Sequence, residues 1–426
     1  MFRKFVLKNG LRLVTVSTPN SPTVGINAII ESGSRYENPK LNGISHFLEH
    51  ICFAGTQKWP TKKTLMTAVE ETGGIINAET RKESTSFWIK TRKDNFERAM
   101  EIICDMVFNP KLDSYSIEKE KEGIIAQVNR RADFPHQYCL DLLFKLAWPN
   151  HPLGQNTLGD RNTVSKITPQ ILSNYKKRFY IPKNTIISVA GDIPNQKITE
   201  SLNKYLSDLK ATPEIFKEDK YIKEDQINPQ LNIVPKDTKQ VYLALGIKAF
   251  SNQNPEKFSL QVIGSLLGIG FSSRLYLSLR EEKNLMFSPQ AFVLLFQDTG
   301  LFIIQAQIVK DKLEEALEAL MKEMVKIKNK KVNSRELRLA KEKLKGRILF
   351  SLENPERLAD WYGTQELLQA KTLTVPEMFN QIDSVTSQDI QRVSDELFID
   401  KNLNLVLVGP VTESKRIAEK LTFGNL

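Results

Sequence analysis

The sequence predicts an α+β protein made of two homologous domains, on the basis of an internal repeat and the order of the expected elements. Residues 179–184 match residues 397–402 when the chain is shifted along itself by about 218 positions. The apolar runs that follow, 185–189 and 403–407, lead to Gly191-Asp192 and Gly409-Pro410. Each half is expected to contain strands, then consecutive helices, then a closing strand. Because this order is not a strict β–α alternation, it favours a sheet with helices packed on one face.

An amphipathic helix is expected at the matching place in each half, after Lys93-Asp94 and after Lys310-Asp311. The apolar stripes, which we interpret as core, are Phe96, Met100, Ile103 and Val107 in the first helix and Leu313, Leu317, Leu320 and Met324 in the second. Another helix is predicted after each, near Ser116 and Ser334, where a serine can cap exposed N–H groups. A charged, aperiodic segment between the halves predicts domains at 1–210 and 232–426 with a linker at 211–231.

The composition is that of an ordinary globular protein, with 41% hydrophobic and 26% charged residues. No stretch approaches the roughly 18 apolar residues of a membrane-spanning helix, and the N-terminal residues lack the apolar core of a signal peptide. A cytoplasmic location is therefore expected. The net charge is +10, but Lys and Arg are interspersed with Glu and no nucleic-acid-binding motif accompanies them, so nucleic acid is not expected as a partner. The three cysteines, Cys52, Cys104 and Cys139, have no paired spacing, which argues against disulfides and against a cysteine-based zinc site.

Two of the four histidines, His46 and His50, lie four residues apart with Glu49 between them. On a helix these three side chains share one face, opposite an apolar face formed by Ile44, Phe47, Leu48, Ile51 and Cys52. The ordinary alternative, a histidine satisfied within the core, does not fit residues that point away from the apolar stripe. Two imidazoles at i and i+4 can chelate one metal ion and leave a position for water, and a nearby carboxylate can accept a proton from that water. The order His-x-x-Glu-His is the inverted form of the common zinc-peptidase helix.

Motifs along the whole chain then indicate a family. They are Gly33-Ser-Arg-Tyr-Glu37, Gly43-Ile-Ser-His-Phe-Leu-Glu-His50, Phe53-Ala-Gly-Thr56, Gly73-Gly-Ile-Ile-Asn-Ala78 with Thr80 and Glu83, Pro152-Leu-Gly154, Ala190-Gly-Asp-Ile193, Phe271-Ser-Ser-Arg-Leu-Tyr276 and Leu279-Arg-Glu-Glu282. With these motifs the chain resembles the pitrilysin family of inverted-motif zinc metallopeptidases (inverzincins), in its mitochondrial-processing-peptidase-like branch.

The resemblance implies two homologous domains, each a mostly antiparallel sheet with helices on one face, which face each other across a cavity. His46 and His50 would bind Zn²⁺ and Glu49 would activate the water. Asn77 and Ala78 would lie in an edge strand that pairs with an extended peptide, since adding a strand to an open edge supplies sequence-tolerant hydrogen bonds. The expected substrates are unfolded peptides or small proteins, and the expected assembly is a homodimer or a heterodimer with a homologous subunit.

The chain departs from the family pattern at two positions. The family's third zinc ligand is a glutamate about 77 residues after the second histidine, and here that position is Gln127. An amide oxygen lacks the anionic attraction of a carboxylate and would hold Zn²⁺ more weakly. Glu120 occupies the position of the family's supporting carboxylate and is expected to serve catalysis with Glu49. In the second domain Arg280 matches a substrate-binding arginine, but the tyrosine expected seven residues later is Phe287, which removes a possible oxyanion donor.

Two functions remain open from the sequence. The first is a zinc metalloendopeptidase in which Glu49 activates a zinc-bound water. The second is a non-catalytic or weakly catalytic peptide-binding subunit that completes the chamber of a partner peptidase.

Overall fold

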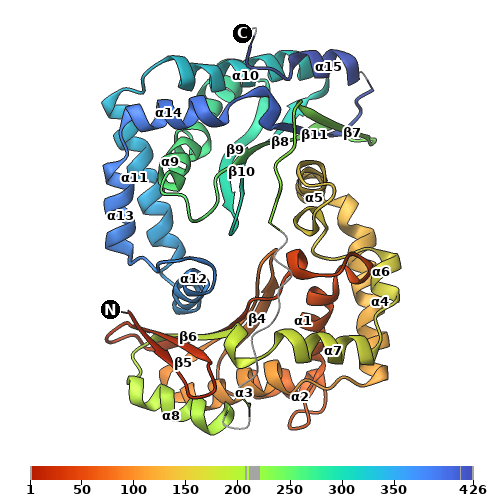
Figure 1. Cartoon of the computed structure of the whole chain (residues 1–426), viewed down its shortest axis with the longest axis vertical. Helices are drawn as coiled ribbons and strands as arrows, with labels where there is room; N and C mark the ends of the chain where they lie inside the picture. Colours follow the sequence, from red (N-terminus) through yellow and green to blue (C-terminus); the bar gives the residue numbers. More distant parts are fainter. Residues whose placement is uncertain (1, 207–208, 211–220, 413, 425–426) are drawn as a thin grey trace. The chain divides into compact units, whose positions relative to one another are not determined.

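The computed structural model describes residues 2–206, 209–210, 221–412 and 414–424 (Figure 1). Part of the predicted linker, 211–220, lies outside the described residues. The chain divides into two compact units. The first is drawn from the ranges Met1–Arg130, Gln155–Asp219 and Phe350–Thr372, and the second from Arg131–Gly154, Lys220–Leu349 and Leu373–Leu426. Each unit contains one mixed β-sheet and several helices, which confirms the α+β class.

The sheet of the first unit has the strand order β1-β2-β6-β3-β5-β4. Its strands are β1 (Phe2–Val6), β2 (Arg12–Ser17), β3 (Thr23–Ile30), β4 (Ile75–Thr80), β5 (Thr85–Arg92) and β6 (Thr185–Gly191). The pair β2/β6 is parallel, and the other pairs are antiparallel. Strand β4 therefore forms one edge of this sheet.

The sheet of the second unit has the strand order β7-β11-β8-β10-β9. Its strands are β7 (Gln230–Pro235), β8 (Gln240–Ala249), β9 (Met286–Leu295), β10 (Gly300–Val309) and β11 (Leu403–Gly409). Here β7/β11 is the parallel pair and the remaining pairs are antiparallel. Apart from β1, the order and pairing match those of the first sheet strand for strand, so the repeat in the sequence corresponds to a repeat in the fold. The domain boundaries at 210 and 232 stay a prediction.

Most helices pack on one face of their own sheet. The helices of the first unit in this group are α1 (Ile44–Ala54), α2 (Lys62–Glu70), α3 (Phe96–Phe108), α4 (Ser114–Arg130), α6 (Arg161–Ser165), α7 (Pro169–Phe179) and α8 (Asn195–Leu206). In the second half they are α9 (Lys257–Gly268), α10 (Leu313–Asn329), α11 (Ser334–Ser351), α13 (Val375–Ser384), α14 (Ser387–Leu397) and α15 (Ser414–Lys420). Both predicted apolar stripes, on α3 and α10, are buried. No described helix is long and apolar enough to cross a membrane.

The predicted serine caps are wrong by a few residues. The carboxylate of Asp113, not a serine, accepts the N–H of Ser116 at 2.9 Å at the start of α4. At the start of α11 the amide oxygen of Asn333 accepts the N–H of Glu336 at 2.9 Å. Asp and Asn are cap residues of the same strength as Ser, so the one that stands at the turn into the helix takes the role.

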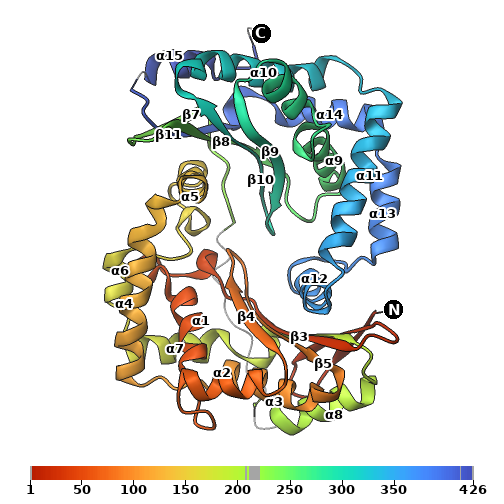
Figure 2. The ribbon, with the colours of Figure 1, turned by 180° about the vertical axis from the view of Figure 1, so that it is seen from behind.

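One helix of each unit packs on the opposite face of the sheet, which corrects the expectation of helices on one face only. Helix α12 (Pro355–Leu368) lies on β3, β6 and β2, and α5 (Pro135–Ala147) lies on β8, β11 and β7 (Figures 1 and 2). Alternate strand residues contact the two helix layers, as Leu405 and Leu407 belong to one core cluster and Val406 and Val408 to the other. Each covering helix comes from the opposite half of the sequence. The sequence contained a signal for this second helix layer, because β6 and β11 are nearly continuous apolar runs, which are typical of strands covered on both faces. In the structure both strands are buried at every position.

Candidate active site

Helix α1 carries the predicted site, and its first turn is held by Glu37. The Oε2 atom of Glu37 accepts the N–H of Gly43 at 2.7 Å, and Oε1 accepts the N–H of Ser45 at 2.9 Å. These N–H groups have no partner inside the helix, so a buried carboxylate satisfies them and complements the positive end of the helix. Gly43 has φ +94, a conformation that favours glycine. Glu37 was part of the quoted motif, but its role at the helix start was not foreseen.

The two histidines lie next to each other, and Glu120 supports one of them. The ring centroids of His46 and His50 are 4.7 Å apart. Nδ1 of His50 lies 3.0 Å from Oε2 of Glu120 on α4, which packs against α1. In the neutral tautomer that bonds this carboxylate, Nδ1–H donates and Nε2 is left as a metal ligand. The structure thus brings the supporting carboxylate of Glu120 to the ring of His50.

The surroundings favour the neutral form of His46 and the ionised form of Glu120. Burial lowers the pKa of His46 to about 3, with a further contribution from His50, so this imidazole stays neutral at ordinary pH. The pKa of Glu120 is lowered, first by its hydrogen bond with His50, so it stays ionised. Neutral imidazole and an anionic supporting carboxylate are the states that a zinc site requires.

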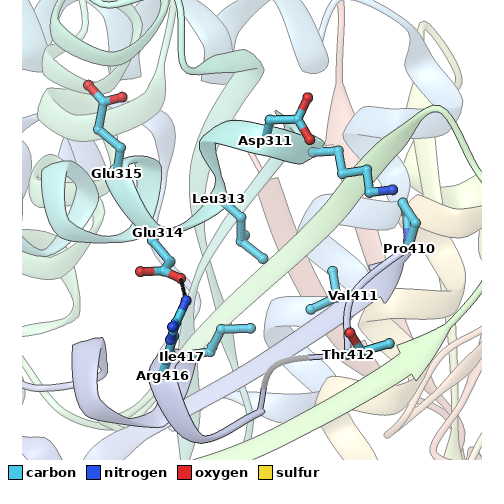
Figure 3. Close-up of a pocket in the computed structure, with 10 residues that line it drawn as sticks. Asp311, Leu313, Glu314, Glu315, Pro410, Val411, Thr412, Arg416 and Ile417 are labelled. Carbon is cyan, nitrogen blue, oxygen red and sulfur yellow. Dashed lines mark ion pairs between the residues drawn. The ribbon is translucent and has the colours of Figure 1, made fainter.

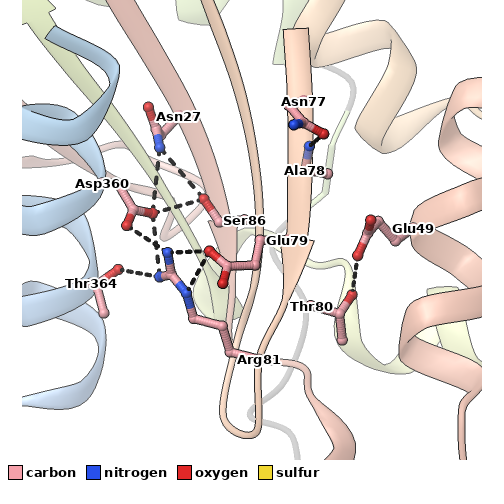
Figure 4. Close-up of polar contacts among 10 residues, drawn as sticks. All are labelled: Asn27, Glu49, Asn77, Ala78, Glu79, Thr80, Arg81, Ser86, Asp360 and Thr364. Atoms are coloured by element: carbon pink, nitrogen blue, oxygen red, sulfur yellow. Dashed lines mark hydrogen bonds and ion pairs between the residues drawn. The ribbon is translucent and has the colours of Figure 1, made fainter. Parts of the chain in front are cut away.

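Glu49 lies between α1 and the edge strand β4. The hydroxyl of Thr80 donates a hydrogen bond to Oε2 of Glu49 at 2.5 Å (Figure 4). Burial raises the pKa of Glu49, while the hydrogen bond from Thr80 acts in the opposite direction. A carboxylate with a raised pKa, held beside two imidazoles, has the properties of a general base.

Gln127 lies about two helical turns after Glu120 on α4, which puts both residues on the same face of that helix. Its amide is half-buried and makes no hydrogen bond to another described residue. Among the residues that the structure describes, no group of three or more His, Cys, Asp and Glu side chains could hold a metal ion.

The donors that the structure brings together on α1 are the two imidazoles of His46 and His50. The buried Nδ1 of His46 has no hydrogen-bond partner in the described part of the chain, so a ring nitrogen of this residue is available without displacing another contact. The two imidazoles fit a divalent metal such as Zn²⁺.

Asn77 and Ala78 lie in β4, at the open edge of the sheet. The N–H of Arg81 donates to the carbonyl oxygen of Ser84 at 2.7 Å in the turn after β4. Because hydrogen-bonded pairs alternate along an antiparallel ladder, Glu79 and Asn77 also pair with β5, and Ala78 and Thr80 direct their N–H and C=O groups outward. In agreement, the N–H of Ala78 bonds to Oδ1 of Asn77 rather than to β5. The main chain of Ala78 and Thr80 therefore faces away from β5 next to Glu49, with the N–H of Ala78 bonded to Asn77 and the main chain of Thr80 hydrogen-bonded to Glu49.

Arg280 and Phe287 are close to each other in the second unit. The guanidinium carbon of Arg280 lies 4.5 Å from the centroid of the Phe287 ring, and NH1 of Arg280 donates to Oδ1 of Asn284 at 2.7 Å. Phe287 thus keeps an aromatic contact with the arginine without offering a hydroxyl group. A separate surface pocket of this unit, of about 510 Å³, lies between the start of α10 and the residues 410–412 and 416–417, and it contains the Glu314–Arg416 ion pair (Figure 3). None of the predicted site residues lines it.

Sequence reasoning missed Asp360 and the pair it forms with Arg81 (Figure 4). Asp360 lies far along the chain, in α12, and belongs to no motif. The available signal was an aspartate inside the otherwise apolar run Leu358-Ala-Asp-Trp-Tyr362, because a charged residue in an apolar helix face requires a partner.

Comparison with known proteins is consistent with this geometry. Residues 12–161 match the family model described as Insulinase (Peptidase family M16), and residues 166–344 match the one described as Peptidase M16 inactive domain. An uncharacterized zinc protease of Rickettsia felis is 30% identical over 406 residues, which cover 95% of this chain and 96% of that protein. The chain belongs to peptidase family M16. The resemblance to the pitrilysin family is thereby confirmed.

Other M16 proteins align over almost the whole chain. The probable mitochondrial-processing peptidase subunit beta of Arabidopsis thaliana is 27% identical over 422 residues, 96% of this chain and 79% of that protein. The crystal structure of a protease from Helicobacter pylori matches with a TM-score of 0.89 and 25% identity, over 96% of this chain and 99% of that chain. The M16 fold therefore extends through both units.

Proposed function

We propose that this M16 protein is a zinc-dependent endopeptidase that holds an extended segment of unfolded polypeptide against β4 and uses Glu49 as its general base. The observation that carries the proposal is the position of Glu49, which shares a helix with His46 and His50 and is hydrogen-bonded to Thr80 on the edge strand. A backbone bound to this edge would run past the carboxylate. Relatives named as zinc proteases support the same chemistry.

The chain's own residues divide the work as follows. His46, His50 and the amide of Gln127 would hold Zn²⁺, which supplies a Lewis acid that makes water a better nucleophile at neutral pH. Glu120 keeps the ring of His50 in its binding orientation. Glu49 accepts the proton of the attacking water and delivers it to the amide nitrogen as the C–N bond breaks. The outward C=O groups of Ala78 and Thr80, with the N–H of Ala78 once it leaves Oδ1 of Asn77, bind the substrate backbone and keep it extended.

The test is hydrolysis of an unstructured peptide by the zinc-loaded protein and by a Glu49→Gln variant. We expect the variant to lose activity by about 100-fold to 10,000-fold, the usual contribution of a general base, while binding zinc as the wild type does. Glu70→Gln, an exposed change on α2, serves as the matched control and keeps full activity. Equal hydrolysis by wild type and Glu49→Gln would contradict the proposal.

The second candidate is a peptide-binding subunit with little or no activity of its own, and Gln127 and Phe287 favour it. A relative named as a subunit beta supports assembly with a homologous chain. In that case the purified chain binds an unstructured peptide, fails to cleave it at saturating zinc, and gains activity on addition of the partner. Light scattering of the purified chain, together with the hydrolysis assay, separates a homodimeric enzyme from a subunit that awaits its partner.

A further inference from the structure

Asp360 forms the centre of a polar network between α12 and the end of β4 (Figure 4). NH2 of Arg81 donates to Oδ2 of Asp360 at 2.8 Å, and NH1 lies 3.4 Å from both Oδ1 of Asp360 and the hydroxyl oxygen of Thr364. Arg81 and Asp360 are 31% and 15% exposed. A largely buried arginine with two contacts to one carboxylate has a restricted orientation, because its planar fork allows few alternatives.

The carboxylate of Asp360 is also hydrogen-bonded to residues of the sheet. The hydroxyl of Ser86 on β5 donates to Oδ1 of Asp360 at 2.9 Å, and Nδ2 of Asn27 on β3 lies 3.5 Å from the same oxygen. Asn27 and Ser86 are buried. The helix approaches the strands closely where glycines leave room, since a Cβ at Gly363 would lie 2.5 Å from Cδ1 of Ile29. Asp360 is thus a fixed anchor and not a mobile surface group.

Arg81 connects this anchor to the predicted site. It follows Thr80 directly, and its guanidinium also bonds Oε2 of Glu79 through Nε at 3.1 Å and NH2 at 2.8 Å. The side chains of Glu79 and Arg81 are therefore tied together on the side of the sheet on which α12 lies. Successive side chains of a strand point to opposite faces, so Thr80, between them, points to the other face and meets Glu49.

We propose that Asp360 is a positioning residue, which fixes the end of β4 through Arg81 and thereby sets the place of Thr80, Glu49 and the peptide-binding edge. This inference rests on the proposed function for its kinetic consequence, but not for its structural one. Without the Asp360 carboxylate the guanidinium loses its anionic partner on α12. The turn after β4 then keeps three other kinds of contact: the Arg81–Ser84 bond, the backbone bonds from Ser34 and Arg35, and the Arg35–Glu83 ion pair. None of these contacts joins the turn to α12.

The test compares Asp360→Asn with Asp141→Asn. The control removes the charge from a similar pair in the second unit, Arg131–Asp141, whose side chains are 28% and 19% exposed. For each protein, hydrogen exchange of the β4 segment is measured by mass spectrometry, and KM and kcat are measured on an unstructured peptide. We expect Asp360→Asn to raise the hydrogen-exchange rate of β4 and to raise KM, each by about tenfold, with a smaller loss of kcat. Asp141→Asn should change neither the exchange rate of β4 nor KM. An increase that is equal in the two variants would show a general loss of stability and would overturn the proposal.

A double-mutant cycle adds a second readout. If Asp360 acts through Arg81, Asp360→Ala and Arg81→Ala together raise KM no more than the larger of the two single changes. Multiplying effects would overturn the proposal.

The two hypotheses fail separately. A wild-type protein that does not hydrolyse the peptide contradicts the proposed function, and the exchange of β4, with the dissociation constant of the uncleaved peptide in place of KM, still decides the role of Asp360. Exchange and peptide affinity within twofold of the Asp141→Asn values would refute that role.

Discussion

The hydroxyl of Thr80 donates to the carboxylate of Glu49 across 2.5 Å, so the strand edge and the predicted base are joined before any substrate arrives. A hydrogen bond to a charged group is commonly worth about 1.5–3 kcal/mol, enough to hold the carboxylate in one orientation. The proposed general base, Glu49, and the strand edge proposed to bind the peptide are therefore coupled through the side chain of Thr80.

Replacing Thr80 by Val should lower kcat by about 10-fold to 100-fold, which is the hydrogen-bond energy expressed as a rate. Val has the same shape but no hydroxyl group, so β4 should remain folded. Thr80→Ser keeps the donor and serves as the control. Steady-state kinetics on an unstructured peptide measure the effect, and a Val variant as active as the Ser variant would show that this bond does not serve catalysis.

Replacing Gln127 by Glu should raise zinc affinity by at least about tenfold, because a carboxylate adds the anionic attraction that an amide lacks. Competition with a fluorescent chelator measures the affinity. Asn129→Asp adds the same charge to an exposed position on the same helix and should leave affinity almost unchanged. Equal gains in both variants would mean that general electrostatics, not ligation, is responsible.

Replacing Glu120 by Gln should weaken zinc binding by about 10-fold to 100-fold, the usual loss when the partner of a ligating histidine is removed. The bond between Nδ1 of His50 and Oε2 of Glu120 is 3.0 Å long, and an amide can present the wrong group to that nitrogen. The matched control is Glu122→Gln, an exposed change on the same helix. Unchanged affinity in the Glu120 variant would show that the ring of His50 is oriented without this carboxylate.

Lowering the pH should weaken the contact of α5 with its sheet. The ring of His136 accepts a hydrogen bond from Nε2 of Gln307 at 2.7 Å, which requires a neutral imidazole, and burial lowers the pKa of His136. A pKa that is lower in the folded state means that the unfolded chain takes up the proton first, so the contribution to stability is present above about pH 6.5 and is lost as the pH falls through the lowered value. The thermal midpoint of the wild type should fall between pH 7 and pH 5 more than that of His136→Gln, which stays neutral. Parallel curves for the two proteins would contradict this.

Much of the fold and of the site follows from local patterns. The stripes on α3 and α10 and the shared face of His46, Glu49 and His50 depend on periodicity, and the duplication of the domain shows as an internal match. A single sequence displays both signals. The places of α5 and α12 do not follow from either signal. An apolar helix face shows that a helix is covered, but not by which sheet, and here the covering sheet belongs to the other half of the chain.

The same distinction explains which of the proposed site residues the sequence could indicate. His46, His50 and Glu49 lie within one helix, and Glu120, Gln127, Asn77 and Ala78 belong to stretches that a family pattern marks. Asp360 and Arg81 form an ion pair although they lie hundreds of residues apart in the sequence. No local sequence pattern indicates such a long-range contact. Glu37 was visible as a motif residue, but its bonds to the start of α1 depend on a turn whose shape only coordinates reveal.

The reciprocal placement of α5 and α12 has a consequence for how the chain can be made. During translation, all strands of the first sheet are synthesised long before α12. The side chains of Val14, Ile29 and Ile186 on the second face of that sheet therefore remain exposed to solvent until most of the chain has left the ribosome. The apolar face of helix α5 likewise remains exposed until the sheet of the second half has been synthesised. Neither half can finish its core alone, and nascent chains in this interval expose the surfaces that chaperones bind. A cut between the halves should therefore yield two fragments that fold only when they are produced together.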